Sequence, residues 1–244
     1  MTINPETTCK YPTAIAIDGP AASGKTTVGA QLAKKMGYLC LDTGVMYRAV
    51  TLAALEAGIP IEDEEGVSEL ARTFRLEFAK PSVEDGRLFD ILINGEDRTL
   101  DIRSSRVNQN VSEVSAYPEV RNAMTKLQRK IARKGNIVMI GRDIGTVVLP
   151  RSKAKFYLEA SLEVRAERRC KEELSKGKKV ELSEIIRSLK HRDDIDGSRK
   201  IAPMSIAKDA IVIKTDNMTP EEVVETMVTA LCEKDVRRTG TTKK

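Results

Sequence analysis

The chain has 244 residues, of which 41% are hydrophobic and 32% are charged. A chain of this length buries one sizeable core without disulfide bonds, so we expect a single principal domain. The net charge of +5 is modest, the sequence has no Trp, and only 4% of its residues are aromatic. These values argue against a nucleic-acid-binding protein, which needs a stronger positive field and more stacking side chains.

Four widely spaced cysteines occur in the chain: Cys9, Cys40, Cys170 and Cys232. With no CxxC pair and a single histidine, they predict reduced thiols and not a zinc site. No segment approaches the roughly 18 apolar residues of a membrane span, and the first thirteen residues lack the apolar run of a signal peptide. We therefore expect a cytoplasmic protein without membrane association.

Short apolar runs alternate with segments whose apolar residues recur at helical spacing. The runs expected to form strands are residues 14–18, 38–41, 137–140, 154–159 and 210–213. The segments expected to form helices are residues 28–36, 45–57, much of 102–134, 162–175, 180–194 and 220–234, and those at 162–175 and 180–194 are too polar to belong to the core. This alternation predicts an α/β fold with a five-stranded parallel sheet flanked by helices. Such sheets bind ligands at the carboxyl ends of their strands.

Residues 73–100 interrupt this alternation. Two runs, 74–78 and 89–93, alternate apolar and polar side chains, and Pro81 and Asp85-Gly86 separate them. The pattern predicts a small antiparallel β insert. Further along, Thr219 and Glu222 have the spacing of a capping box for the last predicted helix.

The pattern G-x-x-x-x-G-K-[ST] is matched in full by Gly19-Pro20-Ala21-Ala22-Ser23-Gly24-Lys25-Thr26, between a predicted strand and a predicted helix. In such a loop, backbone N–H groups converge on phosphate oxygens and Lys25 reaches the β and γ phosphates. The Thr26 hydroxyl is the expected protein ligand of Mg²⁺. ATP or GTP with magnesium is therefore implied. Kinases, ATPases and GTPases share the loop, but the chain has no convincing guanine-reading N-K-x-D tetrad, which disfavours a GTPase.

Other motifs follow in order: Ile17-Asp18-Gly19-Pro20, Leu41-Asp42-Thr43-Gly44 with Tyr47-Arg48, Gly141-Arg142-Asp143-Ile144-Gly145-Thr146-Val147-Val148, and Arg192-Asp193-Asp194 with Asp196 and Arg199. With this set the chain resembles the bacterial cytidylate kinases, a branch of the nucleoside monophosphate kinases, from about Ile15 to Leu231. The resemblance implies one P-loop kinase domain at 13–234, flanked by flexible tails at 1–12 and 235–244. Within it we expect a monophosphate-binding region at about 45–120, which contains the insert, and a helical lid at about 161–200. It also implies a monomer whose partners are CMP, dCMP and ATP.

The resemblance also implies roles for individual side chains. The acceptor phosphate is expected to contact Arg48, Arg142 and Arg199. The ribose is expected to contact Arg192 and Asp196, and the base Ser112, Arg121 and Asp143. Thr43 and Tyr47 complete the expected acceptor set, and Thr27 completes the expected ATP loop.

Physical chemistry agrees with these assignments. Guanidinium groups pair well with a phosphate dianion and offset the repulsion between two polyanions. The Asp143 carboxylate accepts a hydrogen bond from the cytosine N4 amine, whereas uracil O4 is only another acceptor, which favours CMP over UMP. Transfer is expected to be in line and without a covalent enzyme intermediate.

The expected lid carries three further arginines, Arg165, Arg168 and Arg169. In the family such a lid closes over ATP, excludes water and supplies charge to the transferring group. The resemblance therefore implies that Arg165 and Arg168 bind ATP. The expected catalytic residues are Lys25, Arg142, Arg199 and Arg169.

Two positions depart from the family pattern. Ile140 stands where relatives usually carry an acidic residue, so the carboxylate that would orient magnesium-bound water is missing there, and Asp18 or Asp42 becomes the candidate. Ala21 stands where some relatives place a serine in the loop. Two alternatives stay open: a P-loop kinase for another small acceptor such as UMP, AMP or shikimate, and a nucleotide-binding sensor with impaired transfer.

Overall fold

The computed structural model describes residues 11–85, 87–175 and 177–239, with side chains as far as residue 233. Its centre is a parallel sheet of five strands, in the order β2-β6-β1-β7-β8. The strands are β1 (Ala14–Asp18), β2 (Leu39–Asp42), β6 (Ile137–Gly141), β7 (Ala154–Glu159) and β8 (Ile211–Lys214). The predicted five-stranded parallel sheet is therefore confirmed.

Both faces of the three central strands, β6, β1 and β7, are buried, which explains why these strands are continuous apolar runs. On one face, Ile15, Ile17 and Phe156 pack against α1 (Lys25–Met36) and α8 (Pro220–Thr239). On the other face, Ala16 and Met139 belong to the cluster that includes the inner sides of four helices. These helices are α2 (Gly44–Glu56), α3 (Glu64–Thr73), α4 (Ser105–Val114) and α5 (Pro118–Ala132).

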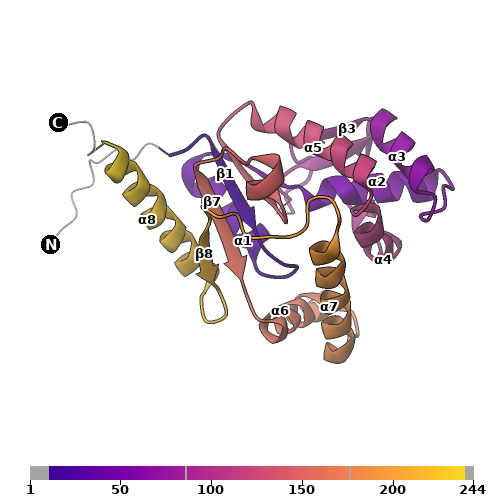
Figure 1. Cartoon of the computed structure of the whole chain (residues 1–244). Helices are drawn as coiled ribbons and strands as arrows, with labels where there is room; N and C mark the ends of the chain where they lie inside the picture. The colour runs from indigo at the N-terminus through magenta and orange to yellow at the C-terminus, as the bar shows by residue number, and fades with distance from the viewer. Residues whose placement is uncertain (1–10, 86, 176, 240–244) are drawn as a thin grey trace.

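Two helices stand apart from these layers. Figure 1 shows α6 (Leu162–Ser175) and α7 (Leu182–Ser198) packed together at one end of the molecule. A small cluster of Ala166, Ile185 and Leu189 joins them to Ala21 of the phosphate-binding loop. The pair occupies the segment expected to form a lid, and it contacts the loop directly.

The insert is a three-stranded antiparallel sheet of β3 (Leu76–Ala79), β4 (Asp90–Ile93) and β5 (Glu96–Asp97). Strand β5 was not predicted. Its signal is the dipeptide Asn94-Gly95, whose φ angles of 53° and 89° form the two-residue turn that joins a tight hairpin.

Two helices differ from expectation. Helix α3 was not predicted, although Asp63 caps it by accepting a hydrogen bond from the Gly66 amide at 3.0 Å. Helix α8 continues to Thr239, so residues 235–239, expected to belong to a flexible tail, are helical. Its predicted capping box is confirmed, because Glu222 accepts from the Thr219 amide at 2.8 Å and Thr219 accepts from the Glu222 amide at 3.3 Å.

Ile140 is a core residue. It is 1% exposed and lies in register with Asp42 of β2 and Ile17 of β1, on the face that α1 covers. A Cβ added to Gly29 of α1 would lie 2.4 Å from Cδ1 of Ile140. The absence of a side chain at position 29 therefore lets α1 approach the sheet over Ile140.

Asp18, at the end of β1, links two loops at the carboxyl edge of the sheet. Its two carboxylate oxygens accept hydrogen bonds from the Ile144 and Gly145 amides, each at 2.7 Å. These amides begin the short π-helical turn Ile144–Val148, directly after Arg142 and Asp143. Burial raises the pKa of Asp18 to about 6, against the opposing effect of the two amides.

Replacing Gly29 with alanine should destabilise the fold. Overpacking lowers the free energy of unfolding by about 1 to 3 kcal/mol. The better helix propensity of alanine offsets no more than about 1 kcal/mol of this loss. Adding Ile140→Val, which removes Cδ1, should restore most of the loss. Urea unfolding of both single variants and the double variant tests this, and simple additivity of the two losses would contradict the contact.

The stability difference between the wild type and Asp18→Asn should depend on pH. Because the pKa of Asp18 lies above its ordinary value of 3.8, the folded protein holds this proton more tightly than the unfolded chain. The carboxyl group therefore favours folding below about pH 4, and this contribution is lost as the pH rises through about 6. We expect the wild type to lose about 3 kcal/mol relative to the variant over that range. A difference that is constant with pH in urea unfolding would refute the assignment.

Candidate active site

The phosphate-binding loop runs from Gly19 to Thr26, between β1 and α1. Gly19 has a φ of 149°, and a Cβ there would lie 2.3 Å from the Leu158 carbonyl oxygen. Gly24 has a φ of 88° and directly precedes α1. Glycine is therefore required at both positions for the loop to fold back over the helix N-terminus.

Lys25 points into this loop. Its ammonium group donates to the Pro20 carbonyl at 2.5 Å and to the Ser23 hydroxyl at 3.2 Å. Burial lowers the pKa of Lys25, and the charge of Arg142 lowers it further. A bound phosphate would supply the negative charge that keeps this ammonium protonated.

Thr26 and Asp42 form the pair that fits a magnesium ion. The two side chains are in direct contact, because the Thr26 hydroxyl donates to Oδ2 of Asp42 at 2.7 Å. The described residues hold no group of three or more His, Cys, Asp or Glu side chains that would bind a metal. Magnesium usually takes one or two protein oxygens and completes its shell with phosphate oxygens and water, so a hydroxyl with one carboxylate suits it. Asp18, the other candidate from the sequence, has both oxygens bonded to backbone amides.

A narrow cavity of about 40 Å³ adjoins the loop. Most of the expected acceptor-binding residues line it: Thr43, Tyr47, Arg121, Arg142, Asp143, Arg192, Asp196 and Arg199. Neither Ser112 nor Arg48 is in the lining, which instead includes Val111 of α4 and Ser115, the residue directly after that helix.

Carboxylates hold several of these arginines. Arg121 donates to Asp143 at 2.5 Å, and its guanidinium carbon lies 5.4 Å from the centre of the Tyr47 ring. Asp196 pairs with Arg142 at 3.0 Å and with Arg199 at 3.2 Å. Burial alone would raise the pKa of Asp196, but the surrounding arginines hold it below its ordinary value.

The site keeps more donors than acceptors. Among the buried groups without a hydrogen-bond partner in the described part of the chain are Nε of Arg121, Nε of Arg192, and Nε and Nη2 of Arg199. Burial lowers the pKa of Arg192 to about 10, and the charge of Arg142 contributes. Unpaired, desolvated guanidinium groups are costly, and an anionic ligand would pair them.

Arg48 lies beside this cavity, on α2. Its Nη1 donates to Oδ1 of Asn108 at 2.6 Å and to the Ile102 carbonyl at 3.2 Å. Burial lowers the pKa of Arg48, and the positive charges of Arg169, Arg103 and Arg142 lower it further. Sequence reasoning did not single out Arg103 or Asn108, because only the folded chain brings the turn at residues 101–103 and α4 next to α2.

The three lid arginines have different surroundings. Arg165 donates to the Ala21 carbonyl of the loop at 3.1 Å and pairs with Asp193 at 2.7 Å. Arg168 donates to the carbonyl of Thr215 at 2.5 Å. Arg169 pairs with two acidic residues of its own helix. Arg165 thus lies against the phosphate-binding loop, whereas Arg169 pairs within its own helix.

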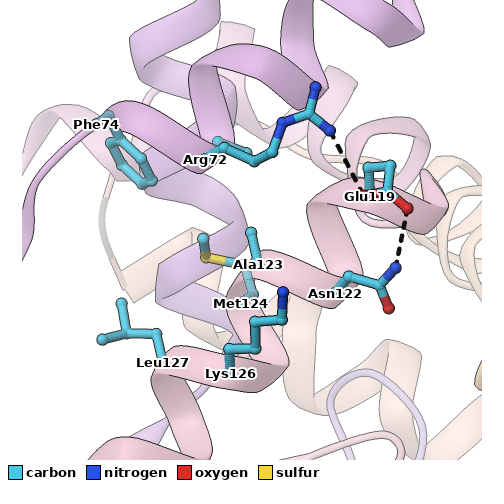
Figure 2. A pocket seen from close by; sticks show the side chains of 9 residues that line it. Arg72, Phe74, Glu119, Asn122, Ala123, Met124, Lys126 and Leu127 are labelled. Atoms are coloured by element: carbon cyan, nitrogen blue, oxygen red, sulfur yellow. Dashed lines mark hydrogen bonds and ion pairs between the residues drawn. The ribbon is translucent and has the colours of Figure 1, made fainter.

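A larger hollow, about 270 Å³, lies between α3 and α5 (Figure 2). Its lining includes Arg72, Phe74, Glu119, Met124 and Lys126. None of the residues expected to bind nucleotide lines it.

Within the described part of the chain, no helix has the length and apolar character needed to cross a membrane.

Comparisons with known proteins identify the family of the chain. A family model described as cytidylate kinase matches residues 15–233. The cytidylate kinase of Caldanaerobacter subterraneus subsp. tengcongensis is 48% identical over 217 residues, which are 89% of this chain and 93% of that protein. The cytidylate kinase of Herpetosiphon aurantiacus is 44% identical, over 91% of this chain and 95% of its own. That of Ligilactobacillus salivarius is 46% identical, over 91% and 97%. The chain therefore belongs to the cytidylate kinase family.

Proposed function

We propose that this chain transfers the γ-phosphoryl group of ATP to CMP or dCMP, giving ADP and CDP or dCDP. The observation that carries the proposal is the junction of two sites at one edge of the sheet. The phosphate-binding loop with Lys25 lies beside a cavity lined by Arg142, Arg199 and Asp143. The family to which the chain belongs supports the same acceptor.

The transfer needs positioning and charge neutralisation. An oxygen of the acceptor α-phosphate attacks the γ-phosphorus, and the bond to the β–γ bridging oxygen breaks, so ADP leaves with that electron pair. No general base is required, because the acceptor phosphate is ionised near pH 7. Lys25, Arg142 and Arg199 then stabilise the charge that spreads over the transferring group.

Arg48, Arg142 and Arg199 would hold the acceptor phosphate, with Arg192 and Asp196 on the ribose. The base would face Arg121 and Asp143, with Ser112 nearby on α4. Asp143 is 5% exposed and its carboxylate is oriented by Arg121. An oriented carboxylate suits the N4 amine of cytosine and disfavours uracil.

Thr26 and Asp42 would hold the magnesium ion that accompanies ATP, which when bound neutralises charge on the β and γ phosphates. The carboxylate of Asp42 would supply the acidic oxygen that position 140 lacks, since the Ile140 side chain lies in the core.

Arg165 and Arg168 would contact ATP from the lid, and Arg169 would reach the transferring group when the lid moves. A cytoplasmic location and a monomeric state are part of the same proposal and rest on the family alone.

Changing Asp143 to Asn should invert the base preference. The variant loses an acceptor for the cytosine amine and gains a donor for uracil O4, so kcat/KM for CMP should fall about 10- to 100-fold while the UMP-to-CMP ratio rises. A coupled assay of ADP formation with both acceptors measures this. Asp63→Asn is the matched control, since asparagine caps α3 as well as aspartate does. Equal losses for CMP and UMP would remove Asp143 from base recognition.

Changing Asp42 to Asn should raise the magnesium concentration required for half-maximal activity by about tenfold or more. The amide keeps the size of the side chain but removes its charge. Titrating MgCl₂ at fixed ATP and CMP gives the value, and Asp63→Asn again serves as the control. An unchanged magnesium dependence would show that Asp42 does not hold the ion.

A further inference from the structure

The three arginines proposed to hold the acceptor phosphate are not held in the same way. Arg142 and Arg199 both pair with Asp196, which neutralises part of their charge. Arg48 contacts only neutral oxygens, from the Asn108 amide and the Ile102 carbonyl. No acidic side chain of the described chain lies within ion-pair distance of Arg48. The Asp42 carboxylate raises the pKa of Arg48, but from beyond that distance.

Asn108 is itself fixed from both ends. Its Oδ1 accepts from Nη1 of Arg48 at 2.6 Å, while its Nδ2 donates to the Arg103 carbonyl at 3.0 Å. The carbonyl partner determines which end of the amide faces the arginine, because only the nitrogen can donate. Asn108 therefore presents an acceptor to Arg48 in a defined direction.

Arg48 lies in a partly buried and positively charged environment, so the charge of its hydrogen-bond partner matters. The side chain is partly buried, and burial lowers the pKa of Arg48, to which the positive charges of Arg169, Arg103 and Arg142 add. An acidic residue at position 108 would satisfy the guanidinium group equally well, but it would also compete with a phosphate dianion for the charge. An amide orients the guanidinium group without this competition.

We propose that Asn108 is a positioning residue that directs Arg48 toward the acceptor phosphate and leaves the charge of Arg48 available to it. The inference rests on the proposed function, because the phosphate in question belongs to the acceptor nucleotide. Asn108 touches no reacting atom and acts through Arg48.

Three variants test the proposal: Asn108→Ala, Asn108→Asp and Asn110→Ala. Asn110 is the matched control, because it lies on the same helix and its Nδ2 donates to the Arg106 carbonyl at 2.8 Å without contacting Arg48. KM and kcat for CMP and for ATP are measured for each, together with calorimetric CMP binding and thermal unfolding.

We expect Asn108→Ala to raise KM for CMP about 3- to 10-fold, with KM for ATP unchanged. Asn108→Asp should raise it further, about 30-fold or more, although it retains an acceptor for Arg48. Its extra effect should shrink at high ionic strength, because it is a charge effect. Asn110→Ala should match the wild type.

A purely structural role for Asn108 predicts that the losses follow the fall in thermal stability and that the extra effect of aspartate persists at high ionic strength, and that pattern would overturn the proposal. An effect equal to that of Asn110→Ala would also overturn it. If the wild type transfers phosphate to another monophosphate, the comparison uses that acceptor. If the wild type binds no monophosphate in calorimetry, the proposed function fails first, and this inference fails with it.

Discussion

The parallel pairing of β1 with β6 is the constraint on which the site depends. Because the two strands run side by side in the same direction, the loop after β1 and the loop after β6 leave the sheet at the same edge. One carries the phosphate-binding motif and the other carries Arg142 and Asp143. Asp18 then ties them together, since it belongs to β1 and binds two amides that follow Asp143. The two loops are therefore joined directly by Asp18.

The second feature of the site is an excess of positive charge, because only a few carboxylates pair with its arginines. Asp196 orients Arg142 and Arg199, and Asp143 orients Arg121. Each pairing positions an arginine and neutralises part of its charge. Several buried guanidinium nitrogens have no hydrogen-bond partner among the described residues, and their desolvation is unfavourable in the free protein. A doubly charged phosphate bound there, as we propose, would supply the missing partners and so be favoured over the empty state.

The fold was largely predictable because its signals are local. Continuous apolar runs such as Ile137 to Ile140 predict buried parallel strands, and the phosphate-binding motif is readable without a structure. Strand β5 was missed because two residues show no alternation, although Asn94-Gly95 marks its turn. The site was less predictable, because its contacts join distant segments. Arg48 and Asn108 are 60 positions apart, and the choice between Asp18 and Asp42 depends on how many carboxylate oxygens accept from backbone amides, which is both oxygens of Asp18 but only Oδ1 of Asp42.

The central claim is that this site passes a phosphoryl group from ATP to a cytidine monophosphate. The most direct measurement incubates the purified protein with Mg·ATP and each of CMP, dCMP, UMP and AMP, and follows ADP and the nucleoside diphosphate by chromatography. The account predicts that CDP or dCDP forms in a one-to-one ratio with ADP, and faster than UDP. ADP that forms at the same rate without an acceptor, or transfer to AMP or UMP ahead of the cytidine nucleotides, would contradict it.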